Sequence, residues 1–213
     1  SLYRKRCPCH RRMYLKRRRS CRQWQQSTAR HGALAKYDST TRLCRFHIII
    51  GMVIKFGTDG WRGIIGDDFT FRNVRICAQA IANYVHQSNL TSRGIVVGYD
   101  TRFGSRYFAE AAAKVIASNG IRAFLCNRPT PTPVVSYYTV HRQAAGALII
   151  TASHNPAQWN GIKYKPEYGG SASPEVVATL EEQIAKISGS NLYQGSHSRQ
   201  TQSTAIVQNV DPK

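Results

Sequence analysis

Gly94-Ile95-Val96-Val97-Gly98-Tyr99, residues 94–99, is a continuous apolar run, and residues 146–151, Gly146-Ala147-Leu148-Ile149-Ile150-Thr151, form a second one. Such runs are typical of strands that are buried on both faces in a parallel sheet. Each run is followed by a polar loop, 100–105 after the first and 151–156 after the second. Because ligands bind at the carboxyl ends of strands in such sheets, both loops are candidate site segments.

Helix and strand patterns alternate on either side of these runs. We expect helices from Asp68 or Thr70 to about Gln87, from Ser105 to Ser118, from Pro133 to His141 and from Pro174 to Ile187. Further strands are expected at 52–56, 121–126 and 162–164, and the Gly/Asp-rich loop 57–63 is expected at the same sheet edge. Repeated strand-helix-strand units predict an α/β fold, a three-layer α/β/α domain with a mostly parallel mixed sheet.

The positive charge of the chain is concentrated at its start. Residues 1–50 hold fourteen Lys and Arg against the single acid Asp38, which is +13 of the net +19. We therefore expect a basic leader at 1–51, the domain at 52–190 and a linker towards a second domain at 191–213. Three interpretations of the leader stay open: a nucleic-acid-binding arm, an organelle transit peptide, or an upstream extension with Met52 as the natural start. The last is favoured, because the leader also carries Trp24 and four cysteines and has no helical periodicity.

Cysteines follow the same division. Cys7, Cys9, His10 and Cys21 lack the paired two-residue spacing of common structural zinc sites. Cys77 and Cys126 stand in apolar patterns, which predicts buried free thiols rather than a disulfide framework. No run approaches the roughly 20 apolar residues that span a bilayer, and no secretory signal is recognisable, so we expect a cytoplasmic protein without membrane contact.

Ser153 is the central candidate for chemistry. It leaves a buried strand in the segment Thr151-Ala152-Ser153-His154-Asn155-Pro156. A serine hydroxyl alone is a poor nucleophile and needs a base, an activated electrophile or a metal. Two alternatives exist: an ordinary turn, since Ser, Asn and Pro are common turn formers, or a serine hydrolase, whose Gly-x-Ser-x-Gly elbow is absent.

This segment, followed by Asn160-Gly161-Ile162-Lys163, resembles the active-site loop of the α-D-phosphohexomutase superfamily, which includes phosphoglucomutases, phosphomannomutases and phosphoglucosamine mutases. The stretch Phe56-Gly57-Thr58-Asp59-Gly60-Trp61-Arg62-Gly63 resembles the amino-terminal signature of that family. Gly98-Tyr99-Asp100-Thr101-Arg102 resembles its Asp-x-Arg loop. The resemblance covers about residues 52–187, with the motifs in order and at fitting intervals.

The resemblance implies a role for each of these segments. Ser153 would carry a phosphoryl group, donate it to a hexose phosphate and recover the other phosphate of a sugar 1,6-bisphosphate, which is also the activator. Mg²⁺ would be the cofactor, with an oxygen of the Ser153 phosphate as one ligand. Arg62 and Lys163 would contact the substrate or shuttle protons, and His154 would support the phosphoserine. The implied supporting loop residues are Thr58, Asp100, Arg102 and Asn155.

Each of these residues also has a simpler interpretation. Arg62 could be a solvated charge, and Lys163 could mark the outward face of an edge strand. His154 could be a local cap donor. Asp100 and Arg102 are expected to pair with each other or to brace the loops rather than to do chemistry.

Several parts of a complete mutase are not found in the sequence. In the family, Mg²⁺ is held mainly by three aspartates of an Asp-Gly-Asp-Gly-Asp-Arg loop in the second domain, and no such segment occurs here. The sugar-recognition loop of the third domain and the phosphate-binding loop of the fourth are not found either. We therefore expect a truncated chain without meaningful turnover, whose partners are a hexose phosphate and domains II–IV of its parent protein.

The sequence leaves open which sugar phosphate is the substrate and to which functional class the protein belongs. Trp61 and Thr151 look more like a phosphoglucomutase or phosphomannomutase than a phosphoglucosamine mutase, which favours glucose or mannose phosphates. A nucleic-acid-binding protein that uses the basic leader on an inert α/β scaffold is the alternative from another class. A non-catalytic module derived from a mutase domain is the third.

Overall fold

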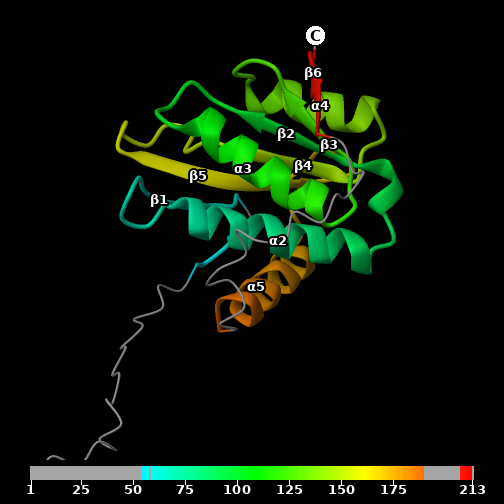
Figure 1. The fold of residues 1–213 in the computed structure, drawn as a ribbon, viewed down its shortest axis with the longest axis horizontal. Helices are drawn as coiled ribbons and strands as arrows, with labels where there is room; N and C mark the ends of the chain where they lie inside the picture. The colour runs from blue at the N-terminus through cyan, green and yellow to red at the C-terminus, as the bar shows by residue number, and fades with distance from the viewer. Residues whose placement is uncertain (1–53, 58, 190–206, 213) are drawn as a thin grey trace, which may run out of the picture. The chain divides into compact units, whose positions relative to one another are not determined.

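The computed structural model describes residues 54–57, 59–189 and 207–212 of the chain (Figure 1). Our predictions for the leader, Met52, Thr58 and residues 191–206 lie outside these described residues. In chain order the elements are β1 (Trp61–Ile64), α2 (Phe71–Gln87), the 3-10 helix η1 (Thr91–Arg93), β2 (Ile95–Tyr99), α3 (Ser105–Ser118), β3 (Ala123–Cys126), α4 (Thr132–His141), β4 (Gly146–Ile150), β5 (Trp159–Pro166), α5 (Pro174–Gly189) and β6 (Val207–Val210).

The strands of the described residues form one six-stranded mixed sheet in the order β1-β5-β4-β2-β3-β6. β4, β2, β3 and β6 pair in parallel, whereas β5 is antiparallel to both of its neighbours, β1 and β4. Every residue of β2 and β4 is buried, as their continuous apolar runs predict. The predicted α/β class with a mostly parallel sheet is therefore confirmed.

Helices cover both faces of this sheet. Figure 1 shows α3 crossing the near face with α2 beside it, and α2 in turn packs against α5. α4 packs against β2 and β4, and Val135 of α4 lies over Gly98 of β2. Tyr99, the next residue of β2, lines a hollow together with residues of α3. Because successive residues of a strand point to opposite faces of the sheet, α3 and α4 lie on opposite faces.

Local signals explain where the helices begin. The Thr70 side chain accepts a hydrogen bond from the backbone N–H of Asn73 at 3.3 Å, which makes Thr70 the N-cap of α2. α3 starts after Gly104, whose φ of 74° suits glycine, and ends before Asn119, as predicted. α4 contains Pro133 in its first turn, where the missing N–H costs nothing.

The predicted strand at 52–56 is wrong for its described residues, 54–56, which belong to no strand. Instead β1 forms within the predicted loop 57–63 and pairs with β5. Lys163 therefore lies in an interior strand and not on an edge. Residues 207–210, which we assigned to a linker, form strand β6 beside β3.

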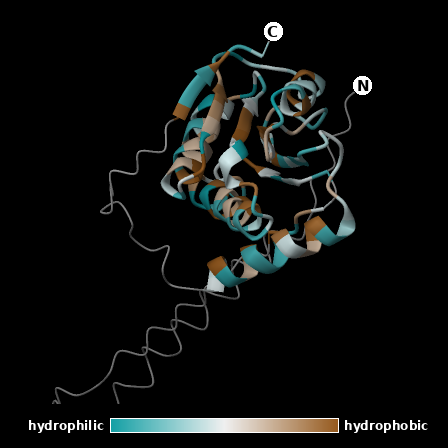
Figure 2. Cartoon of the chain, turned by 90° about the vertical axis from the view of Figure 1, so that its right-hand side faces the viewer, coloured by the Kyte–Doolittle hydropathy of each residue, from teal (hydrophilic) through white to brown (hydrophobic). Residues whose placement is uncertain are grey.

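The interior is apolar and continuous across the described residues. The helices carry both hydrophobic and hydrophilic residues (Figure 2), and buried apolar residues of α2, α3 and α5 belong to one core cluster with those of the sheet. Cys77 and Cys126 are buried free thiols, as predicted, and burial raises the pKa of both. None of the helices in the described segments is long and apolar enough to cross a membrane.

Gly98 tests this packing most directly. A Cβ at Gly98 would lie 2.6 Å from Cγ2 of Val135, so Gly98→Ala forces α4 away from β2. We expect a loss of about 1–3 kcal/mol in the free energy of unfolding, measured by urea denaturation. The matched control is Gly189→Ala at the end of α5, where a Cβ meets nothing within 4 Å and stability should change by less than about 0.5 kcal/mol. Equal effects of the two substitutions would contradict the prediction.

Candidate functional site

The loops that follow β2, β3 and β4 surround an open hollow of about 620 Å³ at the carboxyl ends of these strands. Its lining includes Asp100 and Arg102 after β2, Thr130 after β3, and Thr151, Ser153 and Asn155 after β4. This is the edge at which ligands bind in open α/β sheets. Two of the three predicted site loops, 100–105 and 151–156, thus meet in one place.

Ser153 is exposed in the connection that turns the chain from β4 back into β5. Its backbone N–H donates to the Thr151 hydroxyl at 3.0 Å, and the N–H of Asn155 donates to the carbonyl of Ala152 at 3.1 Å. Its φ is 58°, a left-handed conformation that residues other than glycine adopt only in a few per cent of cases. The backbone therefore presents the serine at the mouth of the hollow in a fixed and unusual geometry.

A cluster of opposite charges stands beside this loop. The Lys163 ammonium donates to both carboxylate oxygens of Asp59 at 2.9 Å, and Arg62 Nη2 donates to one of them at 2.7 Å. Only 10% of the Lys163 side chain is exposed, against 28% of Arg62 and 53% of Asp59. The structure thus brings two of the predicted residues together through a third that the sequence analysis did not single out.

Asp59 keeps a negative charge among these cations. Burial alone would raise the pKa of its carboxyl group, but the hydrogen bonds from Lys163 and the charges of Lys163 and Arg62 lower that pKa below its ordinary value of 3.8. The signal in the sequence was an acid three residues before Arg62 in the 57–63 segment. Its partner Lys163 is 104 residues away, however, and no local pattern reveals that contact.

Asn155 joins the charged cluster to the serine loop. Its side-chain oxygen accepts a hydrogen bond from Arg62 Nη1 at 3.0 Å. Asn155 also lines the hollow next to Ser153. Arg62 is therefore in contact with the serine loop and is not merely a solvated charge.

Asp100 and Arg102 form an ion pair, with Arg102 Nε 3.3 Å from Asp100 Oδ2. The Arg102 guanidinium also reaches across to the serine loop. His154, in contrast, is exposed and makes no hydrogen bond or ion pair with other described residues, and Thr58 lies outside the described part of the chain.

The carboxylates near Ser153 do not fit a Mg²⁺ site. Asp100 is occupied by Arg102 and by the Ser105 hydroxyl, and Asp59 is occupied by Lys163 and Arg62. A hard cation needs about six oxygen ligands. No group of three His, Cys, Asp or Glu side chains that could hold a metal occurs among the described residues.

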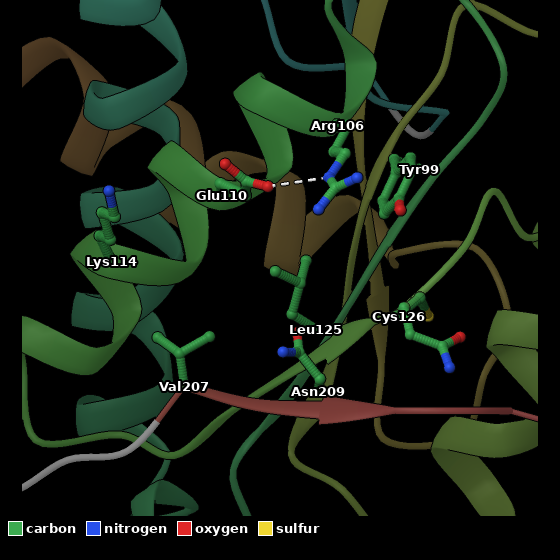
Figure 3. A pocket seen from close by; sticks show the side chains of 9 residues that line it. Tyr99, Arg106, Glu110, Lys114, Leu125, Cys126, Val207 and Asn209 are labelled. Atoms are coloured by element: carbon green, nitrogen blue, oxygen red, sulfur yellow. Dashed lines mark hydrogen bonds and ion pairs between the residues drawn. The ribbon is translucent and has the colours of Figure 1, made fainter.

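A second hollow, of about 330 Å³, lies between α3 and the β2, β3 and β6 strands (Figure 3). Arg106 and Glu110, which lie one turn apart on α3, pair at 3.0 Å in its lining, and Tyr99 and Cys126 line it from the strands. Burial raises the pKa of Tyr99 and of Cys126, which keeps both groups neutral and unreactive at neutral pH. This hollow contains none of the predicted site residues.

Known proteins are similar to this chain over the described domain. Residues 53–190 match the family model described as "Phosphoglucomutase/phosphomannomutase, alpha/beta/alpha domain I". The chain is 38% identical over 141 residues to the phosphoglucomutase of Staphylococcus saprophyticus, which covers 63% of this chain and 25% of that protein. It is 37% identical over 136 residues to the phosphoglucosamine mutase of Clostridium acetobutylicum, which covers 62% and 28%.

A crystal structure assigned to a phosphomannomutase of Thermus thermophilus has the same fold. It superposes with a TM-score of 0.59 at 37% sequence identity and covers 62% of this chain and 30% of that one. This chain therefore spans about a quarter to a third of the length of the relatives that it matches.

The lowered pKa of Asp59 makes its contribution to stability depend on pH. A carboxyl group whose pKa is lowered in the folded state stabilises that state fully above its ordinary value of 3.8, and loses the effect as pH falls through the lower folded value. We expect Asp59→Asn to destabilise the chain by a constant amount between about pH 7 and about pH 5, with the difference shrinking below 3.8. Thermal unfolding of both proteins across this range measures it.

Asp67→Asn is the matched control, because Asp67 is exposed in the turn after β1. Its difference from the parent chain should stay small at every pH. A difference for Asp59→Asn that is the same at pH 7 and well below 3.8 would contradict the prediction.

Proposed function

The chain belongs to the phosphoglucomutase/phosphomannomutase family, and on that premise we propose that Ser153 carries the phosphoryl group that is exchanged with a hexose phosphate. Members of this family are phosphohexomutases, which are isomerases. One observation carries the proposal: Arg62 donates to Asn155, two residues after Ser153, and shares Asp59 with Lys163. Three distant sequence segments thereby supply an exposed hydroxyl and two cations at one sheet edge.

The chemistry proposed for this site is two transfers in opposite directions. In the first, the bond between phosphorus and Ser153 Oγ breaks and phosphorus bonds to a hydroxyl oxygen of the sugar phosphate. The proton that this hydroxyl loses is balanced by the one that the released Ser153 oxygen gains, so the serine hydroxyl is restored. The sugar 1,6-bisphosphate then reorients in the site and returns its other phosphoryl group to Ser153. Phosphoryl transfer depends mainly on positioning and on stabilising charge, which suits Arg62 and Lys163 as substrate contacts. His154, exposed beside Ser153, would support the phosphoserine.

Mg²⁺ enters this proposal only through the phosphate on Ser153, one oxygen of which would be a ligand. The nearby carboxylates of Asp59 and Asp100 are already held by cations. The remaining oxygen ligands would therefore come from outside the described residues.

Glucose and mannose phosphates are the proposed substrates. Trp61 and Thr151 support this choice only by their resemblance to phosphoglucomutases and phosphomannomutases. The Trp61 ring is buried and stacks on Phe69 with ring centroids 5.2 Å apart, so it contributes to the core and not to a sugar contact. Relatives of both kinds are similar to this chain, a phosphoglucomutase at 38% identity and a phosphoglucosamine mutase at 37%.

We expect the chain by itself to lack turnover, because the described residues supply a phosphate carrier and cations without a metal site. The test is to add the purified chain to glucose 1-phosphate, glucose 1,6-bisphosphate and Mg²⁺ and to measure glucose 6-phosphate in a coupled assay. Formation at the background rate is the expected result. Robust formation that Ser153→Ala abolishes would overturn the proposed dependence on further mutase domains.

A chimera tests the role of Ser153 separately. Residues 53–190 replace the matching domain of the Staphylococcus saprophyticus phosphoglucomutase, to which the chain is 38% identical. We expect mutase activity that falls by at least about 1,000-fold in the Ser153→Ala chimera, because the substitution removes the hydroxyl that is proposed to carry the phosphoryl group. Ser118→Ala, on α3, is the control and should retain activity. Equal activity of the Ser153→Ala and parent chimeras would rule out the phosphoserine role.

A further inference from the structure

One guanidinium group holds most of the serine loop. Arg102 Nη2 donates to the carbonyls of Ser153 at 2.9 Å and Asn155 at 2.6 Å, and its Nη1 donates to those of Pro156 at 2.8 Å and Trp159 at 3.1 Å. Only 14% of the Arg102 side chain is exposed. Four carbonyls between residue 153 and the first residue of β5, Trp159, thus receive charge-assisted hydrogen bonds from a single planar donor.

Polar side chains that lie between the guanidinium of Arg102 and the core hold it in place. Asp100 Oδ2 forms an ion pair with Arg102 Nε at 3.3 Å. Asp100 Oδ1 accepts hydrogen bonds from the Arg102 backbone N–H at 3.0 Å and from the Ser105 hydroxyl at 2.7 Å. Ser105 in turn accepts from Asn160 Nδ2 at 2.9 Å, and the Asn160 side-chain oxygen accepts from Gly161 N–H at 2.8 Å. Ser105 and Asn160 are completely buried. A continuous polar chain therefore runs from the interior of β5 to the serine loop.

The left-handed backbone of Ser153 shows what this series of hydrogen bonds stabilises. A φ of 58° at a residue with a Cβ persists only when the surroundings determine it. Arg102 holds the carbonyl of Ser153 on one side, and Thr151 holds its N–H on the other. That backbone sets the direction of the Cα–Cβ bond of Ser153, from which the hydroxyl extends into the lining of the hollow.

We propose that Arg102 is the positioning residue for Ser153: it keeps the loop 153–159 in the one conformation that aims the serine hydroxyl into the hollow, with Asp100, Ser105 and Asn160 orienting its guanidinium. This inference rests on the proposed phosphoryl-carrying function of Ser153 and adds the means by which the hydroxyl is aimed. Lysine cannot substitute, since one ammonium cannot reach four carbonyls in these directions.

Amide hydrogen exchange of the full chain measures the loop directly. In Arg102→Lys, which keeps a cation beside Asp100, we expect the amides of Ser153, Asn155 and Trp159 to exchange about tenfold faster or more than in the parent chain. The amides of α2 and β2 should keep their rates. Arg106→Ala is the matched control, because Arg106 is 69% exposed and pairs with Glu110, away from the loop.

Chemical rescue separates positioning from general stability. In Arg102→Ala, millimolar methylguanidinium should restore slow exchange in the loop, because it replaces the planar donor that was removed, whereas methylammonium at the same concentration should not. Unchanged exchange in the loop of both variants would overturn the inference. So would equal acceleration in α2 and β2, or equal rescue by the two cations, because the loop would then depend on overall stability or on charge alone.

The loop measurement does not depend on phosphoryl transfer. If the Ser153→Ala chimera keeps its activity, the proposed function fails while the exchange and rescue results stand. If the exchange results fail and the chimera loses activity, only the role of Arg102 is lost. The two failures are therefore told apart.

Discussion

The backbone carbonyls between β4 and the start of β5 need hydrogen-bond donors, and Arg102 donates to four of them, the last at Trp159 of β5. A loop at the end of a sheet has polar groups that the strand ladder cannot satisfy, and leaving them unpaired away from water is costly. Placing the donor on the loop after β2 ties two neighbouring strand ends together. The same requirement explains the polar side chains of Asp100, Ser105 and Asn160, which follow one another from the loop towards the interior: each completes the bonding of the next.

A second constraint is the burial of Lys163 in an interior strand. A buried ammonium is tolerated only when an opposite charge and hydrogen bonds compensate for lost hydration. Asp59 provides both, and in doing so it also holds Arg62. The cluster retains a net positive charge beside the serine loop, which suits the phosphate binding proposed there, while the carboxylate offsets the repulsion between the two cations. Stability and the proposed anion recognition thus depend on the same three side chains.

The sequence predicted those parts of the fold whose signals are local. α3 was predicted to the residue, since Gly104 and Asn119 delimit it, and β2 and β4 were evident as apolar runs. β1 was missed, because its glycines and charges read as a loop and its strand geometry comes from pairing with β5. β6 was missed because Val-Gln-Asn-Val has little hydrophobic signal and is a strand only beside β3. The Asp59–Lys163 contact likewise exists only after the sheet has formed.

The carboxylates around the serine loop explain why the described residues can hold the proposed phosphate carrier without also forming a metal site. A carboxylate can either orient a cationic side chain or coordinate a metal ion, but the same lone pairs cannot do both. Asp100 and Asp59 are both committed to Arg102, Arg62 and Lys163, which fixes the serine and its cations in place before any ligand arrives. Preorganisation of that kind lowers the cost of holding a phosphoryl group in position. The two carboxylates therefore serve to orient the cations around Ser153, which is the arrangement that the proposed phosphate carrier needs.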